Sequence, residues 1–267
     1  MYEKNGRLQV EGGEIYFESA GEGDAIVLLH GFGLDARMWE PQFEAFAPSH
    51  RVVRYDLRGF GRSSAPPPVP YSHEDDLKAL LAHLEISRAH VVGLSMGGRM
   101  ALRFAAAYPN AVRSLVLADP ALDGQSWSED WQKRWTEMCE AAKAGRIEDA
   151  KKSWLEHPLF DPARADTAIA SLLATMIADY SGWHWHNRDS ARNPSPPLSQ
   201  RLAEFLAPTL LITGDRDLPD FLAAAELLEK GLPNVRRWTV QGAGHMVNLE
   251  APREFNEQLL KFWSEQQ

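Results

Sequence analysis

The sequence predicts an α/β protein in which a mostly parallel central sheet carries helices on both faces. Short apolar runs, typical of strands buried on both sides, alternate along the chain with segments of helical periodicity. Connections of this kind bring successive strands into a parallel sheet and place the helices against its faces. One long interval without a strand-like run, residues 121–207, predicts a helical insert between two strands.

Eight segments have the composition of strands, and four others have helical periodicity. The first two strands flank Gly12-Gly13 and predict a hairpin. In chain order the predicted strands are Arg7–Val10, Glu14–Ala20, Ala25–His30, Arg51–Asp56, Ala89–Leu94, Ser114–Ala118, Thr209–Gly214 and Val235–Val240. The predicted helices are Trp39–Phe46, Asp75–Leu84, Met96–Tyr108 and Pro252–Trp263, the last with proline in its first turn.

The insert therefore follows the sixth strand. It divides the chain into a core, residues 1–120 and 208–267, and a helical cap, residues 121–207. We expect the cap to lie over the carboxyl edge of the sheet, where proteins of this class bind their ligands.

Composition narrows the range of partners. The net charge of −9, from 28 Lys and Arg against 37 Asp and Glu, argues against nucleic acid or an anionic membrane as a partner. No apolar run is long enough to span a bilayer, and the first residues lack the apolar segment of a signal peptide. Cys139 is the single cysteine, so no internal disulfide can form and we expect cytoplasmic residence. A monomer and a homodimer both remain open.

The stretch Val91–Gly98 combines a strand, a sharp corner and the start of a helix around Gly-x-Ser-x-Gly. A serine at such a corner adopts a strained backbone conformation that exposes its hydroxyl. Gly93 and Gly97 carry no Cβ, which lets the strand and the helix approach each other. The helix N-terminus also places positive charge where an oxyanion would form. The alternative is an ordinary turn, but the flanking strand and helix favour a nucleophile at Ser95.

A serine hydroxyl becomes a good nucleophile when a histidine removes its proton and a carboxylate orients that histidine. Both residue types follow late strands. Gly214-Asp215-Arg216-Asp217 comes after the seventh strand, and Gly242-Ala243-Gly244-His245 comes after the eighth. The order Ser, Asp, His is the one found in α/β-hydrolases.

The chain resembles the α/β-hydrolase family over essentially its whole length. Four motifs carry the resemblance: His30-Gly31-Phe32-Gly33, Gly93–Gly98, Gly214–Asp217 and Gly244-His245. The resemblance implies that Ser95 is the nucleophile, Asp217 the acid and His245 the base, with an oxyanion hole made by the backbone N–H groups of Phe32 and Met96. It implies no cofactor.

Four further residues near these motifs have expected roles. Asp119 and Asp215 remain alternatives for the catalytic acid, since Asp119 occupies a position that supplies the acid in some relatives. We expect His30 to shape the oxyanion loop. We expect Arg58, within Asp56–Ser63, to brace neighbouring loops rather than bind substrate.

The insert contains six of the nine tryptophans, at positions 127, 131, 135, 154, 183 and 185. Trp131 and Trp135 are four residues apart and share a helix face. We expect most of these rings to fill the core of the cap, and we take Trp154, Trp183 and Trp185 as candidates for substrate binding. His184 and His186 have no carboxylate or cysteine at ligand spacing, so no metal is expected.

The stretches Arg51–Ser64 and Gly93–Gly98 are most similar to the 3-oxoadipate enol-lactonase and small carboxylesterase group. Serine at position 95 argues against the haloalkane dehalogenase and epoxide hydrolase branches, which carry aspartate there. Leu94 stands where carbon–carbon bond hydrolases commonly have asparagine, which disfavours that branch without excluding it. The resemblance implies hydrolysis of small, largely apolar esters or lactones through an acyl-enzyme, with perhydrolysis as a variant.

Two questions about function stay open at this level. A slow-turnover, ligand-sensing receptor with the same fold could keep an intact triad, so it is the alternative from a different class. The net charge of −9 disfavours dianionic substrates, but Arg99, Arg188 or Arg192 could create a local positive pocket.

Overall fold

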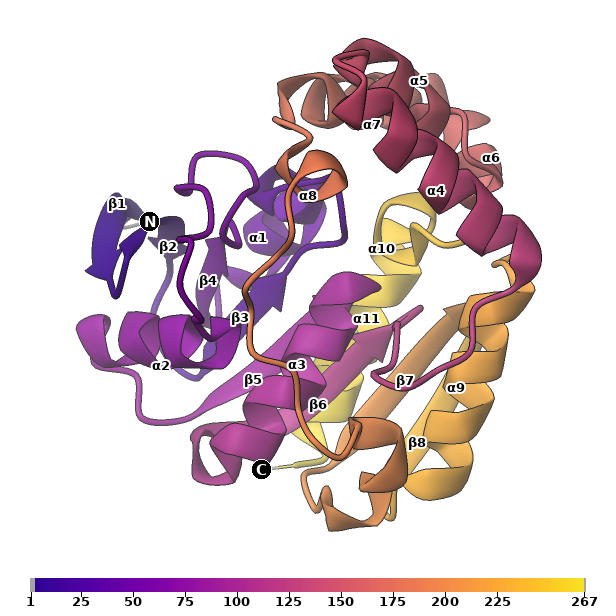
Figure 1. The fold of residues 1–267 in the computed structure, drawn as a ribbon. Helices are drawn as coiled ribbons and strands as arrows, with labels where there is room; N and C mark the ends of the chain where they lie inside the picture. Colours follow the sequence, from indigo (N-terminus) through magenta and orange to yellow (C-terminus); the bar gives the residue numbers. More distant parts are fainter. Residues whose placement is uncertain (1–2, 267) are drawn as a thin grey trace.

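The computed structural model describes residues 3–266, which form an eight-stranded sheet flanked by helices (Figure 1). The strands are β1 (Glu3–Val10), β2 (Gly13–Ala20), β3 (Ala25–Leu29), β4 (Arg51–Tyr55), β5 (Ala89–Leu94), β6 (Val112–Ala118), β7 (Thr209–Gly214) and β8 (Val235–Val240). Their order is β1-β2-β4-β3-β5-β6-β7-β8. Strand β2 is antiparallel to β1 and β4, and the remaining pairs are parallel. The predicted α/β fold class is confirmed.

The centre of the sheet is buried on both faces. Every residue of β3, β5 and β7 is buried, as their continuous apolar runs predict. Val27, Val91 and Leu115 are paired across β3, β5 and β6, and none is exposed. This packing fixes the carboxyl ends of the central strands at one edge of the sheet.

Helices cover both faces of the sheet. Helices α1 (Glu40–Phe46) and α11 (Pro252–Ser264) pack together on one face, and α2 (His73–His83) and α3 (Met96–Ala107) pack together on the other (Figure 1). Helix α9 (Pro219–Gly231), which packs on β7 and β8, was not singled out from the sequence.

Several boundaries differ from the sequence-based expectation by one to four residues, and two of these differences have a clear physical cause. Helix α2 begins at His73 rather than Asp75, because the side chain of Ser72 accepts a hydrogen bond from the backbone N–H of Asp75 at 3.0 Å. Strand β1 begins at Glu3 rather than Arg7, because it pairs with the whole of β2.

The chain between β6 and β7 forms the helical insert, which lies above the carboxyl edge of the sheet in Figure 1. Its helices are α4 (Glu129–Lys143), α5 (Ile147–Leu155), α6 (Asp161–Arg164), α7 (Thr167–Asp179) and α8 (Trp183–His186). After α8 the chain runs back down along α3 (Figure 1). Arg103 of α3 holds this return segment by donating to the carbonyl oxygen of Arg192 at 3.3 Å and to Oδ1 of Asn193 at 2.7 Å.

Arg58 is buried and braces three parts of the core. Its guanidinium donates to Oδ2 and Oδ1 of Asp76 at 2.5 and 2.7 Å, and to the carbonyl oxygen of Glu11 at 2.6 Å. It also lies over the ring of Tyr71, 5.0 Å from the ring centre. Arg58 thus joins neighbouring parts of the core, as expected from the sequence.

The helices are short or interrupted by charged residues. Within residues 3–266, none is long and apolar enough to cross a membrane.

Candidate active site

Ser95 stands at the corner between β5 and α3 with a strained backbone, φ 58° and ψ −116°. Such a conformation costs about 1–3 kcal/mol and persists where the surroundings enforce it. Here a Cβ on Gly93 would lie 2.2 Å from the carbonyl oxygen of Gly97, and a Cβ on Gly97 would lie 2.1 Å from that of Leu29. The corner therefore depends on glycine at both positions.

Neighbouring backbone also holds the corner. The N–H of Ser95 donates to the carbonyl oxygen of Ala118 at 2.9 Å, and the carbonyl oxygen of Ser95 accepts from Ala121 at 3.1 Å. Both partners belong to the end of β6 and the loop after it, so the adjacent strand fixes the direction of the serine.

A histidine and a carboxylate meet at the ends of β7 and β8. Nδ1 of His245 lies 2.9 Å from Oδ2 of Asp217, and the other oxygen of Asp217 accepts from the N–H of Leu218 at 2.7 Å. Because a carboxylate can only accept, the imidazole carries its proton on Nδ1 and leaves Nε2 free to act as a base. Among residues 3–266, Nε2 has no hydrogen-bond partner.

The loop that carries His245 is fixed on several sides. Its ring packs against Phe221, with the ring centres 4.2 Å apart. The carboxylate of Glu250 accepts from the N–H groups of Gly244 at 2.7 Å and Met246 at 2.9 Å, one on each side of the histidine. Glu250 was missed from the sequence, because its role depends on a turn that folds it back onto the preceding loop.

The two alternative acids have other partners. Oδ1 of Asp119 accepts from the N–H of Gly214 at 2.9 Å, and Oδ1 of Asp215 accepts from the N–H of Gly242 at 2.7 Å. Of the three candidate carboxylates, Asp217 is the one hydrogen-bonded to His245.

Asp119 is completely buried, and burial raises its pKa well above the ordinary value for an aspartate. The nearby carboxylate of Asp217 raises the pKa of Asp119 further. Two adjacent buried carboxyls do not both ionise readily, so Asp119 is the member of this pair that keeps its proton.

The predicted oxyanion residues lie at the ends of two adjacent strands. Phe32 follows β3, and Met96 is the first residue of α3 after β5. Neither backbone N–H donates a hydrogen bond to another part of residues 3–266. His30 holds the first loop, since Nε2 accepts from the N–H of Leu57 at 3.0 Å and Nδ1 therefore donates to the carbonyl oxygen of Gly31 at 2.8 Å.

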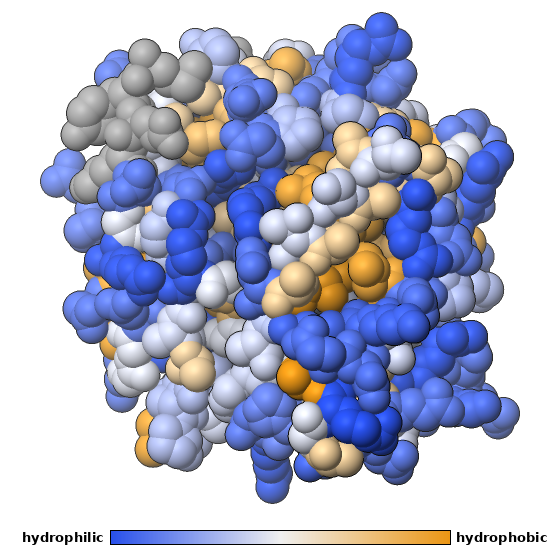
Figure 2. All heavy atoms as spheres, turned by 90° about the horizontal axis from the view of Figure 1, so that it is seen from above, coloured by the Kyte–Doolittle hydropathy of each residue, from blue (hydrophilic) through white to orange (hydrophobic). Residues whose placement is uncertain are grey.

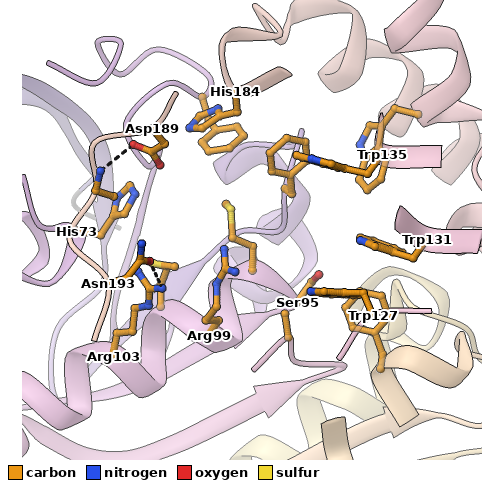
Figure 3. Close-up of a pocket in the computed structure, with 18 of the residues that line it drawn as sticks. His73, Ser95, Arg99, Arg103, Trp127, Trp131, Trp135, His184, Asp189 and Asn193 are labelled. Carbon is orange, nitrogen blue, oxygen red and sulfur yellow. Dashed lines mark hydrogen bonds between the residues drawn. The ribbon is translucent and has the colours of Figure 1, made fainter. Parts of the chain in front are cut away.

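A cavity of about 570 Å³ lies between the core and the insert, and both Ser95 and Met96 line it (Figure 3). One side is aromatic, formed by Phe32, Trp127, Trp131, Trp135, Trp154 and Phe221, and a further ring, Phe60, stacks on His184 of the opposite side. The other side is polar, formed mainly by His73, Arg99, Arg103, His184, Asp189 and Asn193. From the side of the insert, hydrophobic atoms are visible within a mainly hydrophilic surface (Figure 2).

The candidate substrate-binding tryptophans do not all reach this cavity. Trp154 lines it, but Trp183 and Trp185 are not part of its wall. Trp185 is buried within the insert against Tyr180, with ring centres 5.0 Å apart, and α8 instead presents His184 to the cavity. Trp127, Trp131 and Trp135 line the wall. Their four-residue spacing, which places side chains on one face of a helix, could have identified them from the sequence.

His184 and His186 are not neighbours in the site. The ring of His184 stacks on Phe60 with centres 4.4 Å apart, and Nδ1 lies 2.9 Å from the hydroxyl of Tyr180. Burial lowers the pKa of His184 to about 4. Within residues 3–266 there is no group of three or more potential ligands for a metal ion.

This combination of a parallel sheet, a serine on a strand–helix corner and a His–Asp pair on the following strands defines a protein of the α/β-hydrolase class. A sequence model of the family described as "alpha/beta hydrolase fold" matches residues 24–252. The chain belongs to that family.

Several relatives match over nearly the whole chain. The chain is 30% identical over 259 residues to the putative carbamate hydrolase RutD of Azorhizobium caulinodans, covering 94% of this chain and 96% of the relative. It is 29% identical over 236 residues to 3-oxoadipate enol-lactonase 1 of Acinetobacter baylyi, covering 86% and 85%. These matches confirm the expected resemblance to the enol-lactonase and esterase group.

Among solved structures, Est816, described as an N-acyl homoserine lactone degrading enzyme, superposes with a TM-score of 0.75. The two chains are 29% identical, and the match covers 96% of this chain and 100% of Est816. The three proteins named here are thus described as a putative carbamate hydrolase, an enol-lactonase and a lactone-degrading enzyme.

Replacement of Gly93 by alanine should destabilise the protein by about 3 kcal/mol, because the added Cβ overlaps backbone atoms of α3. Gly145→Ala is the matched control, since its Cβ would meet nothing within 4 Å and only its φ of 78° is unfavourable. That control should cost about 1 kcal/mol. Urea unfolding measures both, and equal losses would show that the corner has room for a side chain.

Asp119→Asn should leave turnover within about tenfold of wild type, because the amide mimics a protonated carboxyl. It should also change the pH dependence of stability. A carboxyl whose pKa is raised in the folded state contributes stability that is fully present below its unfolded pKa, about 4, and is lost as pH rises through the folded pKa.

The melting temperature of wild type should therefore fall relative to that of Asp119→Asn as the pH rises above about 4, since the pKa of Asp119 is raised in the folded state. A constant difference across this range would mean that Asp119 does not titrate there. A loss of turnover larger than that of Asp217→Asn would place the catalytic acid after β6.

Proposed function

We propose that the protein is a serine hydrolase that cleaves small carboxylic esters or lactones through an acyl-enzyme. The observation that carries this proposal is the His245–Asp217 hydrogen bond of 2.9 Å at the edge of the sheet where Ser95 turns. Phe221, which packs on the ring of His245, lines the same cavity as Ser95. The nucleophile therefore lines the cavity, and the ring of the base packs against one of the residues that form its wall.

In the first step, Oγ of Ser95 attacks the acyl carbon and Nε2 of His245 takes the hydroxyl proton. Asp217 stabilises the resulting imidazolium and keeps the ring in position. The negative charge on the carbonyl oxygen is met by the N–H groups of Phe32 and Met96 and by the positive end of α3. His245 then gives its proton to the departing alkoxide, which leaves an acylated Ser95.

In the second step, His245 activates a water molecule that attacks the acyl-enzyme and releases the acid. Nε2 of His245 has no partner within residues 3–266, as the base needs for accepting a proton from serine or water. Within residues 3–266 no hydrogen bond joins Ser95 to His245, and catalytic bonds of this kind often tighten only in the substrate complex.

The cavity supports a small-molecule substrate. Its volume of about 570 Å³ lies within the usual range for such sites. Its aromatic side can bury apolar surface at roughly 25 cal/mol per Å² and offers ring-stacking partners. Carbamate hydrolysis and lactone degradation, for which the relatives are named, are likewise hydrolyses at an acyl carbon.

The cysteine content and the net charge of the chain extend this proposal to its location and its partner. A single cysteine precludes an internal disulfide, which supports residence in the cytoplasm. The net charge of −9 supports a small molecule rather than nucleic acid as the partner.

Ser95→Ala should lower the turnover of 4-nitrophenyl esters by about 10⁴-fold, because covalent catalysis is lost. Asp217→Asn should lower it by about 10³–10⁴-fold, because His245 loses the acceptor that sets its tautomer. Both variants should fold, as judged by circular dichroism. Activity of Ser95→Ala within tenfold of wild type would refute the mechanism.

Rapid mixing separates an enzyme from a ligand sensor with the same triad. An enzyme should release nitrophenol continuously after any burst, whereas a sensor should release about one equivalent and then stall in the acylated state.

Trp131→Ala should raise the Michaelis constant for aryl esters about three- to tenfold, because the ring offers an aromatic contact in the cavity wall. The constant for acetyl esters of small alcohols should change less. Trp183→Ala is the matched control, since Trp183 belongs to the same insert but does not line the cavity. Equal effects of both replacements would mean that Trp131 acts only through the packing of the insert.

A further inference from the structure

Arg99 brings an unpaired positive charge to the wall of the catalytic cavity. It lies on α3 one turn after Ser95, and its side chain extends into the space in front of the serine (Figure 3). Its Nε is buried without a partner, and the guanidinium makes no hydrogen bond or ion pair with any residue among 3–266. Burial and the neighbouring guanidinium of Arg103 lower the pKa of Arg99.

Asp123 and Asp189 favour the charged form of Arg99, but within residues 3–266 neither makes an ion pair or a hydrogen bond with it. Asp123 is bound by two nitrogens of Arg103, one of them at 2.7 Å from Oδ2. Asp189 accepts from the hydroxyl of Tyr71 at 3.0 Å and from the N–H of Ala191 at 3.0 Å. Its side chain is exposed, so water screens its charge.

The histidines of the cavity add no positive charge beside Arg99. Burial lowers the pKa of His73 well below its ordinary value and that of His184 to about 4, so both rings are neutral near pH 7. The hydroxyl of Tyr71 donates to Asp189 and lies 3.1 Å from Nε2 of His73, so Nε2 carries the proton of that ring. Among residues 3–266, Arg99 is therefore the one cation of the cavity wall that keeps its hydrogen-bonding capacity for a ligand.

This arrangement is unfavourable without an anion. Arg99 is half-buried and its Nε is fully buried, and withdrawing an unpaired charge from water in this way is destabilising. A cation in the first turn of a helix also opposes the helix dipole. Both penalties are relieved when a negatively charged group binds in the cavity.

We propose that Arg99 binds a carboxylate of the substrate, and that the substrates are small esters or lactones bearing a free carboxylate in addition to the scissile acyl group. A planar guanidinium matches a carboxylate in a bidentate arrangement. Four residues of helix span roughly 6 Å, so the carboxylate lies only a few atoms from the acyl carbon at Ser95. The rest of the substrate faces the tryptophans. This inference rests on the proposed function and narrows its substrate class.

The other two arginines considered for a positive pocket do not line the cavity. Arg192 is exposed and lies 3.7 Å from Asp75. Arg188 is exposed and makes no ion pair within residues 3–266. Arg188 therefore provides a matched control, because its replacement removes the same charge from the protein without altering the cavity.

Matched substrates isolate the effect of the carboxylate. Mono-4-nitrophenyl adipate and its methyl ester carry the group on the acyl side, and 4-acetoxybenzoate and its methyl ester carry it on the leaving group. In at least one pair, Arg99→Met should lower kcat/KM for the carboxylate by about 10- to 100-fold, while kcat/KM for the methyl ester changes less than threefold. Arg99→Lys should restore part of the loss, and Arg188→Met should change neither.

Binding separates failure of this inference from failure of the proposed function. In the Ser95→Ala background, adipate should raise the melting temperature, and Arg99→Met should abolish that shift while Arg188→Met keeps it. This result would support binding of a carboxylate by Arg99 even if wild type hydrolysed none of the esters. Absence of hydrolysis would refute only the proposed function. Equal losses for carboxylates and methyl esters, or adipate binding unaffected by Arg99→Met, would overturn the inference.

Discussion

The close approach of β5 and α3 at Ser95 is the constraint on which the site depends. The strand and the helix can meet at this angle only because Gly93 and Gly97 leave room for backbone atoms of α3 and β3. The two neighbouring strands also position the site. The backbone N–H of Ser95 donates to the last residue of β6, and Phe32 lies in the loop that follows β3. Because β5 is buried on both faces, the close packing around it keeps the strained backbone of Ser95 in place.

A second constraint is the proximity of two buried carboxyls at the ends of β6 and β7. Burial and mutual repulsion favour the protonated form of Asp119, whose pKa is raised, and its Oδ1 accepts from Gly214. Asp217 is free of that role and accepts from His245. Two aspartates that follow neighbouring strands thus have different hydrogen-bond partners, because Asp119 is held by the last residue of β7 and Asp217 reaches His245.

The insert is connected to the oxyanion loop through aromatic contacts. The ring of Phe32 lies 5.0 Å from that of Trp135 and 5.5 Å from that of Trp154. The residue expected to donate to the oxyanion is therefore packed against the wall that encloses the substrate. Opposite this apolar side stands Arg99, and a cavity with one aromatic side and one cationic side orients a ligand that has both characters.

The sequence by itself determined the positions of the eight strands, the strands that the motifs follow, and the residues that make up each motif. Each of these follows from local information: apolar runs, glycines at a corner, and polar residues directly after strands. The tertiary structure decided which tryptophans line the cavity and that Asp217 rather than Asp119 meets His245. It also decided that Arg99 has no hydrogen-bond partner within residues 3–266. These properties depend on how the insert and the loops pack against the sheet, because residues distant in sequence determine what a side chain faces.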